Sequence, residues 1–357
     1  MSVQTSTEQQ LTAILRRRTS AFAALIAGAK LAARTATVGV PVSVVYGLVS
    51  GFVGYQVMQA TIGLQQLDVA LVETWFQITA GAALFLALYL MVQIPKSRTA
   101  SRASWAPAMF AAPLAFTAIA LYLVSSGQAR QIGPVVLQLT LMAWAIVWMT
   151  FGGAFTALAW LRAARNVIDG KTAADGVLAE SAARTLEVAG PHGARVHAVT
   201  IGMQFLLPGI FYALQLAFVD MVVVLDPEKA SLRRAGQLSS GMRGRLFLLL
   251  LLWSLGTYAV WFAVLLPLEG ATTQVAAIEK FQELFLDPSS SSRLGYVVGE
   301  VLWSLSAWVC ELALLVLYLE REEQVRARSQ LKAMKQDAPS TNPYDAPRDE
   351  PGAPVAG

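Results

Sequence analysis

The chain has 357 residues, of which 55% are hydrophobic and only 14% are charged. Soluble domains carry about 25% charged residues. This composition excludes a disordered chain, a disulfide scaffold and a collagen-like fibre, and the net charge of +4 alone indicates no partner. The single cysteine, Cys310, lies within an apolar run and cannot form an internal disulfide. Several stretches are apolar enough to cross a bilayer, so the sequence indicates an integral membrane protein.

The predicted fold class is all-α, a polytopic transmembrane helical bundle. A helix needs about 20 apolar residues to cross a bilayer. Six stretches without Lys or Arg meet that length, at roughly 38–60, 69–94, 107–126, 134–161, 246–268 and 295–319. A seventh, 198–225, is equally apolar but contains Pro208 and Gly209 near its middle. We therefore expect about six full spans plus one broken segment, within a transmembrane bundle at 37–335.

The distribution of basic residues predicts the orientation, because Lys and Arg concentrate on the cytoplasmic side. If 198–225 enters and leaves on one side, 24 of the 27 Lys and Arg residues lie on the same side as both termini. A single crossing would divide the basic residues almost evenly. The first arrangement predicts a multi-pass protein of the inner (plasma) membrane with cytoplasmic termini and an external 269–294 loop. It makes 198–225 either a re-entrant hairpin with Pro208-Gly209 at its tip or a pair of half-helices, and the alternative is one kinked crossing helix.

Three cytoplasmic segments are predicted to be amphipathic helices rather than spans. Residues 1–36 form a basic interfacial helix that begins with Thr5 and Glu8 as a capping box and continues to about residue 34. A second helix near 172–190 opens at Thr172 with Asp175 and stops at Gly190-Pro191, and a third near 227–240 opens at Asp226-Pro227. The Pro-rich tail at 336–357 is predicted to be disordered.

Basic residues on two of these helices are candidate contacts for anionic lipid: Arg16, Arg17, Arg18, Lys229, Arg233 and Arg234. The alternative is a solvated, lipid-touching scaffold. Membrane lipids are thus the expected partners, and no nucleic-acid partner is expected. The first span also has small residues at intervals of four, at Gly39, Ser43, Gly47 and Gly51. Such a face allows close helix packing, either within the chain or through self-association or another membrane protein.

Four acids lie within predicted membrane segments: Glu73, Asp220, Glu300 and Glu311. Acids inside a membrane often mark an ion pathway or a proton relay. Glu300 and Glu311 share one helix face with Ser304 and Ala307. These acids are a possible ion or proton site, although they could also lie at the interface or form hydrogen bonds within the bundle.

No catalytic signature is present in the sequence. His192 and His197 are five residues apart, a poor spacing for metal ligation from a helix, so no metal or cofactor is expected. A membrane enzyme remains the third hypothesis, after the two given below, because no nucleophile–base set or metal cluster is visible. The stretch from about 204 to 253 resembles the membrane-domain family named after glycerophosphoryl diester phosphodiesterases. The resemblance rests on Pro208-Gly209-Ile210, Asp226, Ala230 to Arg234 and Gly241 to Phe247. It implies an accessory membrane domain, because the catalytic barrel of those enzymes is absent from this chain.

The leading hypothesis is an integral inner-membrane protein with a structural, accessory or membrane-organising role and no catalytic chemistry of its own. The alternative is a transporter or channel-like protein in which Asp220, Glu300 and Glu311 form a proton or cation site. The two differ in whether the intramembrane acids face an aqueous pathway or serve packing.

Overall fold

The computed structural model describes residues 2–65, 119, 129–229, 231–271, 273–286 and 292–336. Within these ranges every regular element is helical, which confirms the all-α prediction for this part of the chain. Five segments are long and apolar enough to cross a membrane by length and composition: Ala21–Tyr55, Ala145–Ile168, Leu207–Leu225, Arg243–Leu268 and Arg293–Met334. The predicted spans at 69–94 and 107–126 and most of the predicted tail lie outside the described residues.

The chain divides into two compact units, Met1–Arg18 with Leu319–Gly357, and Thr19–Tyr318. The first unit holds α1 (Ser2–Arg16) and the end of α12 (Arg293–Gln336). In this unit the Gln324 side-chain amide donates to the Arg17 carbonyl at 2.8 Å and to Glu320 at 3.2 Å. An amide that bonds a backbone carbonyl left free at a helix end stabilises that end.

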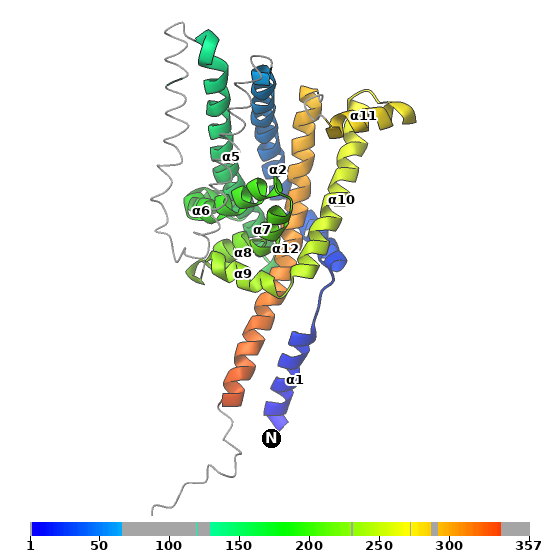
Figure 1. Ribbon diagram of the computed structural model, residues 1–357. Helices are drawn as coiled ribbons and strands as arrows, with labels where there is room; N and C mark the ends of the chain where they lie inside the picture. The colour runs from blue at the N-terminus through cyan, green and yellow to red at the C-terminus, as the bar shows by residue number, and fades with distance from the viewer. Residues whose placement is uncertain are drawn as a thin grey trace, which may run out of the picture. The chain divides into compact units, whose positions relative to one another are not determined.

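The second unit holds the remaining helices and the first part of α12. Its elements are α2 (Ala21–Gln65), α5 (Ala129–Ile168), α6 (Val177–Met203), α7 (Leu207–Gln215), α8 (Val219–Leu225), the 3₁₀ turn η1 (Pro227–Lys229), α9 (Leu232–Ser240), α10 (Arg243–Leu268) and α11 (Gln274–Leu286). In Figure 1, α2, α5, α10 and this part of α12 run roughly parallel, whereas α6 lies at a steep angle to α5.

The prediction of one continuous helix from Thr5 to about residue 34 is wrong, because the helix is interrupted. The first helix ends at Arg16, and α2 begins at Ala21. Ser20 caps the new helix, since its hydroxyl accepts from the Ala23 amide at 3.1 Å. The predicted interfacial segment and the predicted first span are instead joined, as α2 continues from Ala21 to Gln65.

The small-residue face of α2 packs against α12. A Cβ atom added at Gly47 would lie 2.6 Å from the Val301 Cα, and one added at Gly51 would lie 2.8 Å from the Val297 Cα. Both distances are shorter than real Cβ contacts, so larger side chains would force the helices apart. Gly39 lies against the Trp308 ring, and Ser43 is fully buried. The four residues therefore form an intramolecular helix contact.

The predicted stop at Gly190-Pro191 is wrong. Helix α6 begins at Val177, after a turn in which the Asp175 amide donates to the Thr172 carbonyl, and it continues through Pro191 to Met203. A proline within a helix costs roughly 3 kcal/mol. His192 and Arg195, which follow Pro191, form side-chain contacts with α8 and α12.

The segment predicted at 198–225 is divided between three helices. Its first residues complete α6, the chain reverses at residues 204–206, and Pro208 lies in the first turn of α7. Proline is favoured there because the amide it lacks would have no partner. A second break at residues 216–218 separates α7 from α8. Pro208-Gly209 thus begins a helix rather than forming a hairpin tip, and a continuous kinked helix is also excluded.

The reversal before α7 is a γ-turn centred on Leu206, which has φ 51° and ψ −68°. The Leu207 amide donates to the Phe205 carbonyl at 2.6 Å. This conformation is rare and strained for a residue with a side chain. The two helices meet closely beside it, because a Cβ at Gly202 would lie 2.8 Å from the Gly209 nitrogen.

The helix predicted near 227–240 is also divided. Pro227–Lys229 forms η1, and α9 starts only at Leu232, where the Ser231 hydroxyl accepts from the Arg234 amide at 3.1 Å. The predicted N-cap, Asp226, is instead paired with the Arg234 guanidinium at 3.0 Å. Ser231 takes the capping position because it directly precedes the regular helix.

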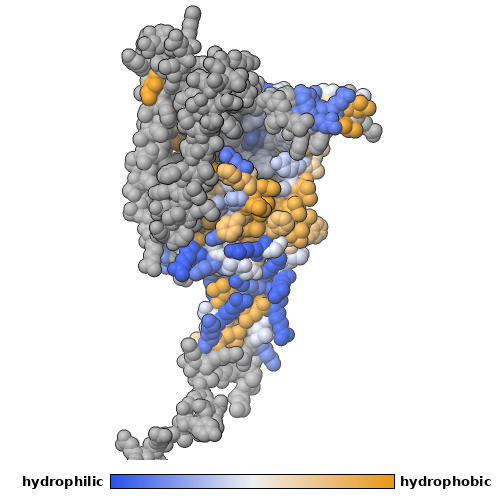
Figure 2. All heavy atoms as spheres, in the orientation of Figure 1, coloured by the Kyte–Doolittle hydropathy of each residue, from blue (hydrophilic) through white to orange (hydrophobic). Residues whose placement is uncertain are grey.

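Burial is greatest at α8, where residues Val219 to Val224 are all buried. Helix α10 is mostly exposed, since only 17% of its most apolar stretch is buried. Figure 2 shows a hydrophobic area where α7 and α10 lie. A long apolar helix without protein cover is typical of a helix that faces lipid.

Candidate functional site: a buried charge cluster

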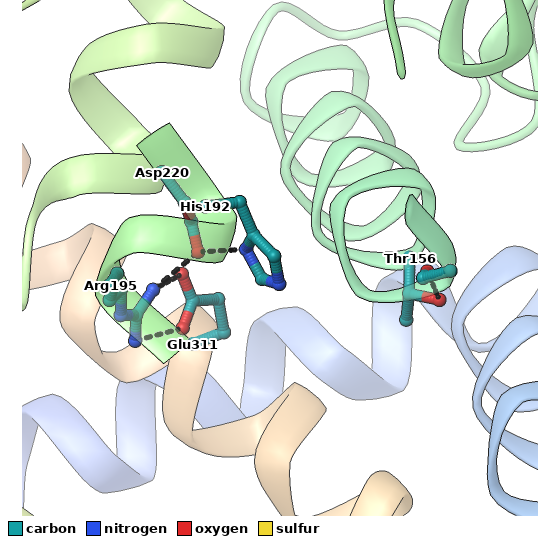
Figure 3. A network of polar contacts seen from close by, with 6 residues as sticks. Thr156, His192, Arg195, Asp220 and Glu311 are labelled. Carbon is teal, nitrogen blue, oxygen red and sulfur yellow. Dashed lines mark hydrogen bonds and ion pairs between the residues drawn. The ribbon is translucent and has the colours of Figure 1, made fainter. Parts of the chain in front are cut away.

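Four charged or ionisable side chains meet where α6, α8 and α12 come together (Figure 3). The Arg195 guanidinium of α6 donates to both carboxylate oxygens of Glu311 on α12, at 3.0 and 3.1 Å. The same guanidinium donates from Nη1 to Asp220 on α8. A two-pronged contact between Arg and a carboxylate is among the strongest polar contacts in proteins. Arg195 therefore joins three helices.

His192, one turn before Arg195 on α6, completes the cluster. Its Nδ1 lies 3.0 Å from Asp220 Oδ2, the oxygen that also accepts from Arg195. The other carboxylate oxygen, Asp220 Oδ1, is buried and has no hydrogen-bond partner within the described residues. Asp220 is 1% exposed and Glu311 6%, so neither carboxylate has bulk water to solvate it. Each depends on the neighbouring side chains for its solvation.

Helix α5 packs against α6 next to the charge cluster. A Cβ at Gly153 would lie 2.5 Å from His192 Nε2, so only glycine leaves room for the ring. The Thr150 hydroxyl lies 2.8 Å from His197 Nε2 and donates its own hydrogen to the Ile146 carbonyl at 2.8 Å. The Thr150 hydroxyl thus links α5 to His197 on α6.

The cluster favours the charged form of arginine. Burial by itself would lower the pKa of Arg195, but the carboxylates of Glu311 and Asp220 outweigh burial and raise that pKa above its ordinary value. Burial, and secondarily His192, lowers the pKa of His197.

The structure separates the predicted acids. Asp220 and Glu311 meet in the cluster, Glu300 lies elsewhere on α12, and Glu73 lies outside the described residues. The Glu300 Cβ packs against α2, 3.3 Å from a Cβ added at Gly51. No ion pair joins Glu300 to a basic side chain in the described part of the chain. Asp220 and Glu311 thus have Arg195 as a basic partner, although the predicted membrane segments in which they lie contain no Lys or Arg.

The sequence did not identify Arg195 and His192 as functional residues. Arg195 counted as one of five basic residues in a cytoplasmic connection, and the predicted helix stopped before it. A usable signal did exist, because continuing α6 past Pro191 places His192 and Arg195 one turn apart on a helix. Nothing in the local sequence indicates their partners, which lie 25 to 116 residues away.

The predicted lipid-contact residues have differing environments. Arg16, Arg17, Arg18 and Arg233 are exposed, whereas Arg234 is half-buried against Asp226, and Lys229 belongs to η1. Within the described ranges, no group of three or more His, Cys, Asp or Glu residues could hold a metal ion.

Comparisons with protein-family models, with curated proteins and with solved structures find no match to this chain. The resemblance of residues 204–253 to the phosphodiesterase membrane domains therefore stays a prediction.

Proposed function

We propose that this chain is a multi-pass inner-membrane protein with a structural or membrane-organising role and no catalytic chemistry of its own. The observation that supports it is the way Arg195 is used. Its guanidinium donates to two buried carboxylates from different helices, an arrangement suited to holding helices in a fixed position. A carboxylate bound on both oxygens by an arginine is poorly available to a transported ion.

The arrangement joins the three kinds of segment in the second unit. Helix α12 is a candidate span, α8 is a short buried helix, and α6 crosses the bundle. Removing one partner from such a buried cluster leaves an uncompensated charge. The cluster thus specifies how the crossing helix sits on the spans, which is a scaffold function.

The orientation proposed for this scaffold has both termini in the cytoplasm and the 269–294 loop outside. Cysteine-accessibility labelling in a Cys310→Ser background tests it, since Cys310 is buried and is the one native cysteine. A cysteine at Ser240, which is exposed in α9, should react only from the cytoplasmic side. Labelling of that position from outside would contradict the proposal.

The absence of transport is tested in proteoliposomes that contain a pH-sensitive dye. The wild-type protein should give the same proton flux as empty vesicles under an imposed pH gradient. Flux above that background, lost in a Glu311→Gln variant that folds and reconstitutes normally, would reject the scaffold proposal.

The second candidate function is a proton or cation pathway through the intramembrane acids. One observation favours it, namely that Asp220 Oδ1 is buried and lacks a hydrogen-bond partner within the described residues. Such an oxygen can accept a proton or a water molecule. On this hypothesis Asp220→Asn should abolish flux while Glu300→Gln, away from the cluster, reports whether a second acid belongs to the same pathway.

The resemblance to phosphodiesterase membrane domains supports the same class of role. It would make residues 204–253 an accessory membrane domain, with the basic stretch from Arg233 to Arg245 on its cytoplasmic side. No hydrolase activity is proposed.

A further inference from the structure

The turn between α6 and α7 carries large apolar side chains on its outer surface. Leu207 is 75% exposed and Leu206 is 64% exposed, and the neighbouring apolar residues are about half exposed. We define the 203–211 patch as Met203, Phe205, Leu206, Leu207 and Phe211. An exposed apolar patch of this kind marks a surface that contacts a protein or a membrane.

The 203–211 patch is held in place by its backbone. The Phe205 amide donates to the Gly202 carbonyl at 3.0 Å, and the Leu206 amide donates to the Met203 carbonyl at 3.1 Å. The γ-turn at Leu206 places a leucine side chain where φ is 51°, a conformation that favours glycine. Strain of this kind persists only where surrounding contacts impose it. The turn thus presents its apolar side chains in a defined arrangement.

A positive charge lies beside the patch. The Arg243 guanidinium carbon is 5.8 Å from the centre of the Phe211 ring, and Arg243 is exposed. Arg243 is also the first residue of α10, which is a candidate span. Arginine at the end of a span lies at the level of the lipid headgroups. The contact with Phe211 therefore brings the patch to that same level.

We propose that the 203–211 patch enters the lipid of the bilayer while Arg243 binds the phosphate of an anionic phospholipid headgroup. The inference rests on the proposed membrane function, because it takes α10 as a span. Charge complementarity selects this occupant, since an apolar surface next to an arginine matches acyl chains next to a phosphate. Phe211 fixes the direction of the guanidinium through a cation–π contact.

The depth of the patch can be measured with nitroxide labels in nanodiscs. Single cysteines are placed at Leu207, at Leu255 in the exposed part of α10 and at Gln237 in α9, all in the Cys310→Ser background. Collision with oxygen relative to a water-soluble nickel chelate reports depth. Leu207 should lie in lipid but at a shallower depth than Leu255, which is near the middle of α10, and Gln237 should be accessible to the chelate.

The outcomes separate the inference from the proposed function. If Leu255 lies in lipid and Leu207 is in water, the inference is rejected and the span stands. If both positions are in water, the membrane placement of α10 fails, and the proposed function fails with it.

Headgroup binding is tested with Arg243→Gln in mixed phosphatidylcholine and phosphatidylglycerol bilayers. The ratio of the two lipids that stay bound through detergent purification is the measurement. One basic residue near an anionic surface changes lipid binding about fivefold, so the variant should lose most of its phosphatidylglycerol enrichment. Lys171→Gln, at an exposed lysine in the turn after α5, is the matched control and should keep that enrichment. Equal enrichment in wild type and Arg243→Gln, or equal loss in both variants, would reject a site at Arg243.

Leu206→Gly provides a check that is independent of charge. Glycine accepts φ 51° without strain, so the variant should unfold at the wild-type temperature or higher in detergent. In nanodiscs it should lose stability relative to the wild type, because the apolar side chain that enters the lipid is gone. A variant as stable as the wild type in nanodiscs would contradict insertion of the turn.

Discussion

Two acids on α12 illustrate how differently one long apolar helix can accommodate a carboxylate. Glu311 lies where α6, α8 and α12 meet and is bound on both oxygens by Arg195. Glu300, three turns earlier, lies along the α2–α12 contact, where glycines bring the two backbones together. The first region is held by charge and the second by close backbone packing. Residue type alone therefore does not say whether an intramembrane acid is a site or a structural element.

The strongest expected effect comes from removing the shared cation. Arg195→Met leaves Glu311 buried without a basic partner and Asp220 with His192 alone. The variant should destabilise the protein by about 3–5 kcal/mol. Unfolding in detergent, followed by circular dichroism, measures it. Arg165→Met is the control, because that arginine is paired with Asp169 on the surface and should cost no more than about 1 kcal/mol. Equal losses in the two variants would remove the cluster as a stabilising element.

The glycine contact should be the next most sensitive feature. Gly47→Leu places side-chain atoms against the Val301 backbone, which cannot move aside, and overpacking of this kind costs about 1–3 kcal/mol. Val45→Leu, on the exposed face of the same helix, should have almost no effect. The measurement is the unfolding temperature of each variant in detergent. Similar values would show that the stability of the protein does not depend on the close approach of α2 and α12.

The two acids can be compared directly through their amide variants. Glu311→Gln weakens the contact with Arg195 and should cost about 1.5–3 kcal/mol, the range for hydrogen bonds to charged groups. Glu300→Gln should cost less than about 1 kcal/mol, since no ion pair within the described residues is lost. Equilibrium unfolding of both variants gives the difference. A larger loss at Glu300 would reverse the assignment of the structural role.

The smallest effect concerns pH. His197 is held neutral in the folded protein because burial lowers its pKa, whereas in the unfolded chain it takes up a proton near pH 6.5. Between those two pKa values the unfolded state binds more protons, so stability should fall as the pH drops below about 6.5. His197→Gln should show a weaker decline. If the melting temperatures of the wild type and His197→Gln fall equally between pH 7.5 and 5.5, this contribution of His197 is contradicted.

The sequence predicted the features that depend on local pattern. The helical class and the small face of Gly47 and Gly51 follow from span-length apolar runs and four-residue spacing. Helix ends were predicted poorly, because the break before Ser20 and the continuation of α6 through Pro191 depend on a cap and on tertiary contacts.

Only the acidic half of the buried cluster could be predicted from the sequence. Asp220 and Glu311 stood out as acids within apolar runs, but their partner Arg195 belonged to a polar connection and looked like one more cytoplasmic charge. Pairing between residues 25 and 116 positions apart is a property of the packed bundle. Charge counts along the chain cannot show it.

The spacing of the cluster along the chain has a consequence for biosynthesis. Arg195 and Asp220 are synthesised close together, but Glu311 follows 91 residues after Asp220. At roughly 5–20 residues per second, the ribosome needs about 5–18 s to reach it. During that interval the guanidinium has only Asp220 to neutralise it, and α6 has no link to α12. A nascent chain that stops short of Glu311 therefore carries an unfinished junction, which gives quality-control proteases a physical difference between incomplete and complete copies.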